Sequence, residues 1–309
     1  MKRRRAAAFA AALLGWTALA GCARAQGKAP APVRVDTAAL RASIDTIARA
    51  HRGTLAYVVR DIDAGTEIAS RADETFPTAS LIKVAVLVTV FDLVEKDLLS
   101  LDDQLTVLRI DQVGGSGVLQ YLHPGLAISV RDAVWLMITI SDNTATNLLL
   151  DRIIIRRVWD KMEQLGLPHT KIHSKTFLRS SSVAMDSSVK YGLGVTTPRE
   201  MSRLFELIAR GRAVSPAADS TMLDILEHTE YQEMLMRYAG GVRAAHKGGQ
   251  VDASRSECAL YQLSSRVVVC VMTKENTDQS WVIDNGEQVA AARIGQVVVN
   301  GWGPAKPSP

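Results

Sequence analysis

Two residues one helical turn apart have the chemistry of a nucleophile and its base. Ser80-Leu81-Ile82-Lys83 follows Pro77-Thr78 and opens an apolar stretch, residues 79–98, that predicts a buried helix. A serine hydroxyl needs a neighbouring base, and a lysine three residues later on a helix lies on the same face. Burial lowers the pKa of a lysine toward the range in which its neutral amine is such a base. We therefore predict that Ser80 is a nucleophile activated by Lys83.

A second match shows that this spacing is weak evidence by itself. Ser187-Ser188-Val189-Lys190 has the same spacing, but it falls in a serine-rich stretch that we predict to be a loop with no apolar helix behind it. Taken alone, Ser80 also fits a helix cap, and Lys83 fits a side chain whose ammonium reaches solvent. The buried helix therefore distinguishes the two matches.

Two further polar motifs lie next to apolar segments. Ser141-Asp142-Asn143 separates the apolar stretches 134–140 and 148–155, where Asp142 by itself would simply cap the second helix. His246-Lys247-Gly248-Gly249 ends a predicted strand, and its small residues would let a substrate backbone lie alongside. Read alone, this second motif also fits a plain turn.

In this order the three motifs resemble those of class A serine β-lactamases and related penicillin-binding serine hydrolases. Residues 141–150 are especially similar to that family, and residues 196–201 fall where the family starts a helix. The likeness covers nearly the whole predicted mature chain. It implies an α+β fold of the β-lactamase/transpeptidase type: an antiparallel sheet from both termini, flanked by helices, with an all-helical subdomain.

The resemblance implies four catalytic roles. Ser80 would attack the lactam carbonyl, and Lys83 would take or relay its proton. Ser141 would pass a proton to the departing nitrogen. Lys247 would support Ser141 and attract the substrate carboxylate.

The resemblance also implies the substrate-binding residues. The backbone N–H groups of Ser80 and Gln250, beside Gly249, would form the oxyanion hole, where one donor is typically worth about 3 kcal/mol. Asn143 would hold the substrate's side-chain amide. Arg255 would help to bind the carboxylate, with an ordinary exposed strand arginine as the alternative.

Two departures from the family pattern bear on activity. Gly248 stands where the family has a threonine, so one hydroxyl for the substrate carboxylate is missing and we expect looser binding.

Class A enzymes also carry a glutamate, before the helix that starts near Thr197, which holds the water that releases the acyl-enzyme. Residues 164–199 contain no glutamate, and Asp186 is their only carboxylate. Glu163 belongs to the preceding helix, and Glu200 is expected in a capping box.

Three functions therefore remain open. The first is a β-lactamase with an atypical deacylation route, in which Asp186 or Lys83 assists. The second is a D,D-peptidase or esterase-like hydrolase that uses the same serine. The third is a non-hydrolysing penicillin-binding lipoprotein that is acylated and stalls.

The sequence also predicts the elements that position these residues. Helical spacing spans 37–50 and 197–209, where Thr197 is the cap, Pro198 the first helical residue and Glu200 reaches back. Strand patterns cover 55–62, 67–70, 244–248, 258–263 and 266–273, and a helix covers 282–299. Residues 101–211 read as helical, without convincing strand pairs. Because the strand patterns lie at both ends of the chain with helices between them, we predict one sheet built from both ends.

The first residues predict export. Lys2 and Arg3–Arg5 precede an apolar run, 6–20, which is too short for a membrane span but fits a secretory signal. We predict a signal peptide over 1–21, a tether over 22–34 and a catalytic domain over 35–309. Within that domain, 35–76 and 212–309 form the α/β part and 77–211 the mainly helical part. Cys22 fits a bacterial lipobox, which implies a periplasmic protein held to the membrane only by a lipid on this cysteine; the alternative is cleavage after Ala23-Arg24-Ala25.

Composition excludes other classes of function. Of the 36 Lys and Arg, four lie in the signal, so the rest balance the 32 Asp and Glu, and no cationic surplus remains for nucleic acid. His169 and His173 lack a third ligand nearby, so we expect no metal and no cofactor. We expect a monomer acting on a β-lactam or peptidoglycan-derived small molecule.

Cys258 and Cys270 lie on neighbouring predicted strands, and we favour two buried free thiols over a disulfide.

Overall fold

The computed structural model describes residues 35–304. The predicted signal peptide, Cys22 and the tether lie outside the described residues. The chain forms these elements: α1 (Thr37–Ala50), β1 (Thr54–Asp61), β2 (Thr66–Ser70), β3 (Phe76–Pro77), η1 (Ala79–Ile82, a 3₁₀ turn), α2 (Lys83–Glu95), β4 (Gln104–Thr106), η2 (Leu119–Tyr121), β5 (Ala127–Ser129), α3 (Val130–Thr139), α4 (Asn143–Ile153), α5 (Ile155–Gln164), β6 (Lys171–Ile172), η3 (Arg179–Ser181), α6 (Met185–Tyr191), β7 (Gly194–Thr196), α7 (Pro198–Ala209), α8 (Pro216–Glu227), β8 (Ala244–Val251), β9 (Ser254–Gln262), β10 (Arg266–Lys274) and α9 (Gly286–Trp302).

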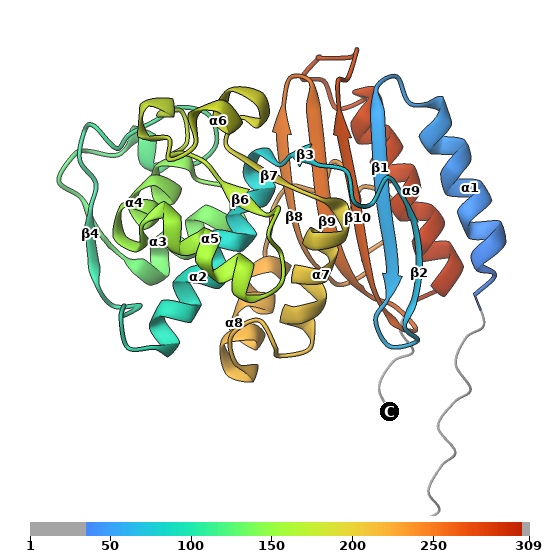
Figure 1. Ribbon diagram of the computed structural model, residues 1–309, viewed down its shortest axis with the longest axis horizontal. Coiled ribbons are helices and arrows are strands. Elements are labelled where there is room, and N and C mark those ends of the chain that lie inside the picture. Colours follow the sequence, from blue (N-terminus) through green and yellow to red (C-terminus); the bar gives the residue numbers. More distant parts are fainter. Residues whose placement is uncertain (1–34, 305–309) are drawn as a thin grey trace, which may run out of the picture. The chain divides into compact units, whose positions relative to one another are not determined.

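The main sheet is antiparallel and five-stranded, in the order β2-β1-β10-β9-β8. It joins the two ends of the chain because β1 pairs directly with β10, which confirms the predicted sheet. Helices α1 and α9 lie side by side on one face, and α7 packs on the sheet from the other (Figure 1). With both faces covered, β9 and β10 are buried along most of their length, and β10 is continuously apolar over 267–272 rather than alternating.

Two apolar clusters hold these layers together. One fills the space between the sheet and the α1–α9 pair, with Leu40, Ile44, Ile294 and Val298 in its core. The other joins the opposite face of the sheet to the helices of residues 77–211. Helix α2 crosses this second cluster and is buried from Lys83 to Leu93, as its all-round apolar sequence predicted.

Residues 77–211 contain more strand than the sequence predicted. Two small sheets, β3-β7-β6 and β4-β5, are built from strands of two or three residues, which are too short to show a period-two pattern. The predicted loop at Ser187 was also wrong, since Ser187 and Lys190 lie on the short helix α6. This part of the fold is therefore mainly helical rather than all-helical.

The start of α7 confirms one half of the predicted capping box. The Thr197 side chain accepts a hydrogen bond from the Glu200 N–H at 3.1 Å, and Pro198 is the first helical residue. The Glu200 carboxylate does not return to the cap. It binds the backbone N–H and Nδ1 of His169 and the hydroxyl of Thr170, at 2.6 to 3.0 Å. Glu200 therefore binds groups of His169 and Thr170 instead of completing the capping box.

The two cysteines form a disulfide, so the expectation of free thiols was wrong. Cys258 on β9 and Cys270 on β10 are directly opposite one another in the strand register and are bonded through their sulfurs. Side chains at opposite positions of an antiparallel pair lie close enough to react in an oxidising compartment. The register, which the sequence did not give, decided the pairing.

None of the helices within residues 35–304 has the length and apolar character needed to cross a bilayer. In the same residues, no group of three His, Cys, Asp or Glu side chains is placed to hold a metal ion. His169 contacts Glu200, whereas the Nδ1 atom of His173 lies 3.1 Å from the Gly192 carbonyl.

Candidate active site

Ser80 lies on a tight turn that is fixed from both sides. The stretch predicted as one helix begins instead with η1, preceded by a β3–β7 pair and by a hydrogen bond from the Thr78 N–H to the Gly194 carbonyl at 3.1 Å. Ala79 has a φ of +43°, a left-handed conformation that is costly for a residue with a Cβ. This strained turn places Ser80 at the junction of two cavities.

Lys83 is fully buried one turn later and is surrounded by oxygen acceptors. Its Nζ donates to the Ser141 carbonyl at 2.8 Å, to Ser141 Oγ at 3.2 Å and to Asn143 Oδ1 at 2.9 Å. Burial holds the pKa of Lys83 well below its ordinary value, and the nearby charge of Lys247 adds to this, with Asp142 partly opposing both. The neutral amine that general-base catalysis requires is therefore favoured.

The Ser141-Asp142-Asn143 motif enters α4 and is held by Asp142. The Asp142 carboxylate caps α4 through the Ala145 N–H at 2.9 Å and accepts the N–H groups of Val118 and Leu119 at 2.7 and 2.9 Å. Ser141 has a φ of +57°, a second left-handed residue in the site. Asp142 thus acts as the predicted cap and also fixes the loop at residues 117–119.

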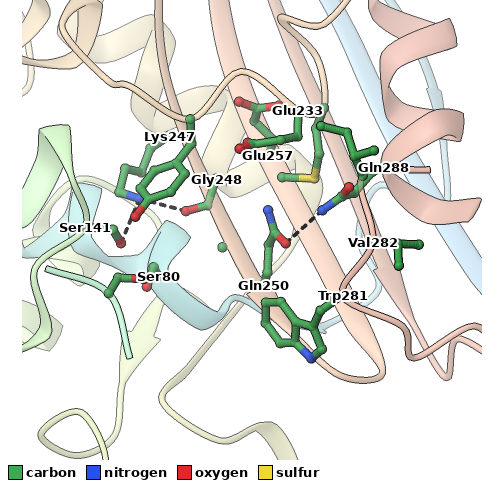
Figure 2. Close-up of a pocket in the computed structure, with 15 residues that line it drawn as sticks. Ser80, Ser141, Glu233, Lys247, Gly248, Gln250, Glu257, Trp281, Val282 and Gln288 are labelled. Atoms are coloured by element: carbon green, nitrogen blue, oxygen red, sulfur yellow. Dashed lines mark hydrogen bonds between the residues drawn. The ribbon is translucent and has the colours of Figure 1, made fainter. Parts of the chain in front are cut away.

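Lys247 reaches Ser141 from the edge strand of the main sheet. Its Nζ donates to Ser141 Oγ at 3.1 Å and to the Gly248 carbonyl at 2.8 Å (Figure 2). Burial lowers the pKa of Lys247 to about 8, although the charge of Glu257 raises it. Two buried lysines, from the helical part and from the sheet, therefore converge on one hydroxyl.

The glycine at position 249 is required by close backbone packing. A Cβ there would lie 2.2 Å from the Thr78 carbonyl oxygen and 2.6 Å from the Ser80 nitrogen, so β8 can pass η1 only without a side chain. Gln250 follows at once, and its side-chain oxygen accepts from Gln288 Nε2 of α9 at 3.0 Å (Figure 2). This contact ties the end of β8 to α9.

At position 248 this chain has glycine where the family has threonine, and the space beside the glycine is occupied by another side chain. A Cβ on Gly248 would lie 3.0 Å from the terminal methyl of Met234. The buried methionine thus occupies space beside the strand that a side chain at 248 would need. No sequence motif pointed to Met234.

Two cavities meet at Ser80. The first, which we call the Lys247 cavity, has a volume of about 360 Å³ and is lined by Ser141, Lys247 and an apolar wall that includes Met234 and Trp281. The second, the Asn143 cavity, has a volume of about 790 Å³ and is lined by Asn143, residues 174–177 and Leu193. Ser141 and Asn143 therefore face different sides of the same nucleophile.

Arg255 does not line either cavity. It is buried, donates to the Val251 carbonyl and, at 2.9 Å, to the Ser280 carbonyl, and its guanidinium lies 4.6 Å from the centre of the Trp281 ring. In the strand register it is opposite Gln250. These contacts hold Arg255 against the Trp281 ring and the backbone of residues 251 and 280, outside the lining of both cavities.

The residues that line the Asn143 cavity include no Asp or Glu. Asp186 is exposed in the first turn of α6 and is not part of this lining, and Glu163 pairs with Lys171 at 3.0 Å. No carboxylate from the interval in which the family has its glutamate therefore lines this cavity in the described structure.

A threonine that the sequence did not suggest faces this cavity. Asn147 holds the backbone of Thr176 by accepting its N–H at 2.7 Å and donating to its carbonyl at 3.2 Å. Thr176 lines the Asn143 cavity, and its hydroxyl is buried and has no hydrogen-bond partner among the described residues. An unpaired buried hydroxyl beside a nucleophile is a place where a substrate or water group can bind.

Comparison with known proteins agrees with this geometry. A model of the Beta-lactamase enzyme family matches residues 39–302. β-Lactamase L2 of Stenotrophomonas maltophilia is 28% identical over 248 residues, 77% of each chain. A β-lactamase structure from Sphaerobacter thermophilus has a TM-score of 0.77 at 26% identity and covers 88% of this chain and 100% of its own.

A second kind of relative is a penicillin-binding protein by name. The structure of PBP-A superposes with a TM-score of 0.75 at 25% identity, covering 87% of this chain and 97% of its own. Ancestral class A β-lactamase matches with a TM-score of 0.74 at 25% identity, over 84% and 99%. From the family match over most of its length and from these neighbours, the chain belongs to the β-lactamase enzyme family and is a serine hydrolase of the class A β-lactamase type.

Proposed function

We propose that β-lactams acylate Ser80 and that the resulting acyl-enzyme is released slowly. The observation that supports this most strongly is the convergence of Lys83 and Lys247 on Ser141 Oγ, at 3.2 and 3.1 Å, beside the cavity that Ser80 lines. This arrangement can take a proton from one side of the reaction centre and deliver it to the other.

In the proposed acylation, Ser80 Oγ attacks the lactam carbonyl while Lys83 accepts its proton. The N–H groups of Ser80 and Gln250 bind the developing oxyanion, and the close passage of β8 by η1 at Gly249 supports their pairing. Ser141 donates its proton to the lactam nitrogen as the C–N bond breaks, and a lysine ammonium restores it. Lys247, charged below pH 8, attracts the substrate carboxylate.

Deacylation is the step that we propose to be slow. A water that attacks the acyl-enzyme needs a base, and the Asn143 cavity is lined by hydroxyl and amide groups but by no carboxylate. Thr176 offers a hydroxyl, which can orient a water but is a poor base. An acyl-enzyme of this kind is known for a structural neighbour, because a point mutant of PBP-A was solved as an acyl-enzyme complex with penicillin G.

The missing carboxylate also favours a second function, a D,D-peptidase or penicillin-binding protein. In that case the Asn143 cavity would take the acyl half of a peptidoglycan-derived peptide. We further propose that the protein is a monomer exported to the periplasm and anchored through a lipid on Cys22, in agreement with its first residues.

The test follows the mature protein with benzylpenicillin and a chromogenic cephalosporin, by intact mass and by absorbance, beside Ser80→Ala. We expect a mass increase of one penicillin on the wild type, slow turnover, and neither in Ser80→Ala. Rapid turnover would contradict slow release, and release of D-alanine from a peptide would identify the peptidase. The absence of any adduct and any turnover would overturn the mechanism.

A further inference from the structure

A third cavity continues the Asn143 cavity away from Ser80. We call it the Tyr191 cavity; its volume is about 680 Å³. The two cavities adjoin, because five residues line both: Ala79, Arg179, Gly192, Leu193 and Val251. We call the two adjoining cavities the groove; Ser80 and Asn143 line one of them and Tyr191 lines the other.

Cationic side chains dominate the lining of the Tyr191 cavity. Arg179 on η3, Lys190 on α6 and Lys274 on β10 line the Tyr191 cavity, and Glu275 is its one acidic lining residue. Glu275 accepts a hydrogen bond from the Thr54 hydroxyl at 3.0 Å. Three cations against one carboxylate leave a positive surface in this cavity.

The ion pairs of the described residues show which of these charges are free. Lys274 lies 3.5 Å from Glu74, a loose pair whose side chains are 24% and 42% exposed. Arg179 and Lys190 form no ion pair within residues 35–304, and both are exposed. By contrast, Lys175 in the Asn143 cavity is paired with Asp151 at 2.7 Å. The available positive charge therefore lies along the Tyr191 cavity, with Arg179 where the two cavities adjoin.

Tyr191 lies among these cations. Its hydroxyl is 2.9 Å from the Thr75 hydroxyl, and the Lys190 Nζ lies 4.9 Å from the centre of its ring. Burial raises the pKa of Tyr191, but the bonds with Thr75 and Lys190 and the charges of Lys190 and Lys274 outweigh it, so the net pKa is lowered. An environment that favours a negative charge on the phenol would favour a bound anion as well.

We propose that this groove selects acyl donors whose acyl chain ends in a carboxylate, bound by Arg179 and Lys190 several bonds away from the scissile amide. The inference rests on the proposed function, in which the acyl side chain leaves Ser80 past Asn143. An arginine presents a planar fork that matches a carboxylate, and a lysine adds a mobile charge. The apolar residues Leu193 and Val251, which line both cavities, suit the methylene part of such a chain.

The test uses two penicillins that differ only at the chain end, with adipoyl and hexanoyl side chains of equal length. Intact mass gives the second-order rate constant for labelling of Ser80. Exposed ion pairs are each worth a factor of a few, so we expect the adipoyl compound to react roughly fivefold faster at low salt. This advantage should shrink in 0.5 M NaCl, because exposed charges are screened.

The double variant Arg179→Gln/Lys190→Gln should abolish the adipoyl preference, so that the two penicillins label Ser80 at equal rates. The matched control is Arg49→Gln/Arg52→Gln, which removes two exposed charges at the end of α1 and should retain the preference. Equal labelling by the two penicillins, or a preference that survives in the Arg179/Lys190 variant, would overturn the groove proposal alone. Labelling by neither compound would overturn the proposed function and this inference together.

Discussion

The two cavities that meet at Ser80 are built in different ways. On the Lys247 side, Ser141 and Lys247 are buried, bonded to each other and supported by the sheet and α9. On the Asn143 side, the wall is the loop 174–177, with a buried hydroxyl on Thr176 that has no partner among the described residues. In the proposed mechanism the groups for forming an acyl-enzyme are thus present on one side, whereas the groups for hydrolysing it are sparse on the other. We therefore expect that substitutions can change the two half-reactions separately.

The largest expected effect comes from removing the base on which the first half-reaction depends. Lys83→Met should lower the rate of acylation by about 10³-fold, because a positioned general base contributes roughly 10²- to 10⁴-fold. The measurement is labelling of Ser80 by benzylpenicillin. Lys96→Met is the control, since this lysine is exposed near the other end of α2. An unchanged labelling rate in Lys83→Met would remove Lys83 from the mechanism.

Closing the space between β8 and η1 should have the next largest effect. Gly249→Ala would put a Cβ against the Thr78 carbonyl and the Ser80 nitrogen, and moving one oxyanion donor should slow acylation by about 10²-fold. Gly248→Ala is the matched control, because its Cβ meets only the flexible end of Met234 at this short range. Similar rates for both variants would argue against the oxyanion assignment. Thermal unfolding separates a catalytic loss from a folding loss.

A substitution on the Asn143 side should raise the rate of deacylation rather than lower the rate of acylation. Thr176→Glu would place a carboxylate where the buried hydroxyl now lies, and we expect hydrolysis of the penicilloyl-enzyme to accelerate roughly thirtyfold, because a base then faces the attacking water. The decay of the mass adduct measures this rate. Ser180→Glu adds the same charge to an exposed residue that does not line the cavity and should have little effect. An equal acceleration in both variants would show that charge, not position, is responsible.

The smallest expected effect is a pH dependence on the Lys247 side. Burial lowers the pKa of Lys247 to about 8, so its ammonium is present below that pH and is lost above it. The acylation efficiency for a penicillin, which carries a carboxylate, should fall about tenfold between pH 7 and pH 9. Lys247→Arg keeps its charge over this range and should show a flat profile. A wild-type profile as flat as that of the variant would contradict the role of this charge.

Much of the fold was predictable because local patterns agree with the tertiary structure. Helix α1 has the predicted bounds, and β1 and β10 differ from them by one residue, since a long amphipathic or buried segment shows its period clearly. The strands β3, β6 and β7 could not be predicted, because two or three residues show no period. Their pairing nevertheless fixes the turn that carries Ser80.

The sequence by itself determined the family, and it predicted Ser80, Lys83, Ser141 and Lys247 as the catalytic residues, because their types and order carry the chemistry. Only the tertiary structure decided what surrounds them. Strand register paired Cys258 with Cys270 and Arg255 with Gln250, and a one-residue change in register turns every side chain to the other face. The loop held by Asn147 brought Thr176 to the Asn143 cavity. Such contacts join residues far apart in the chain, and no local pattern encodes them.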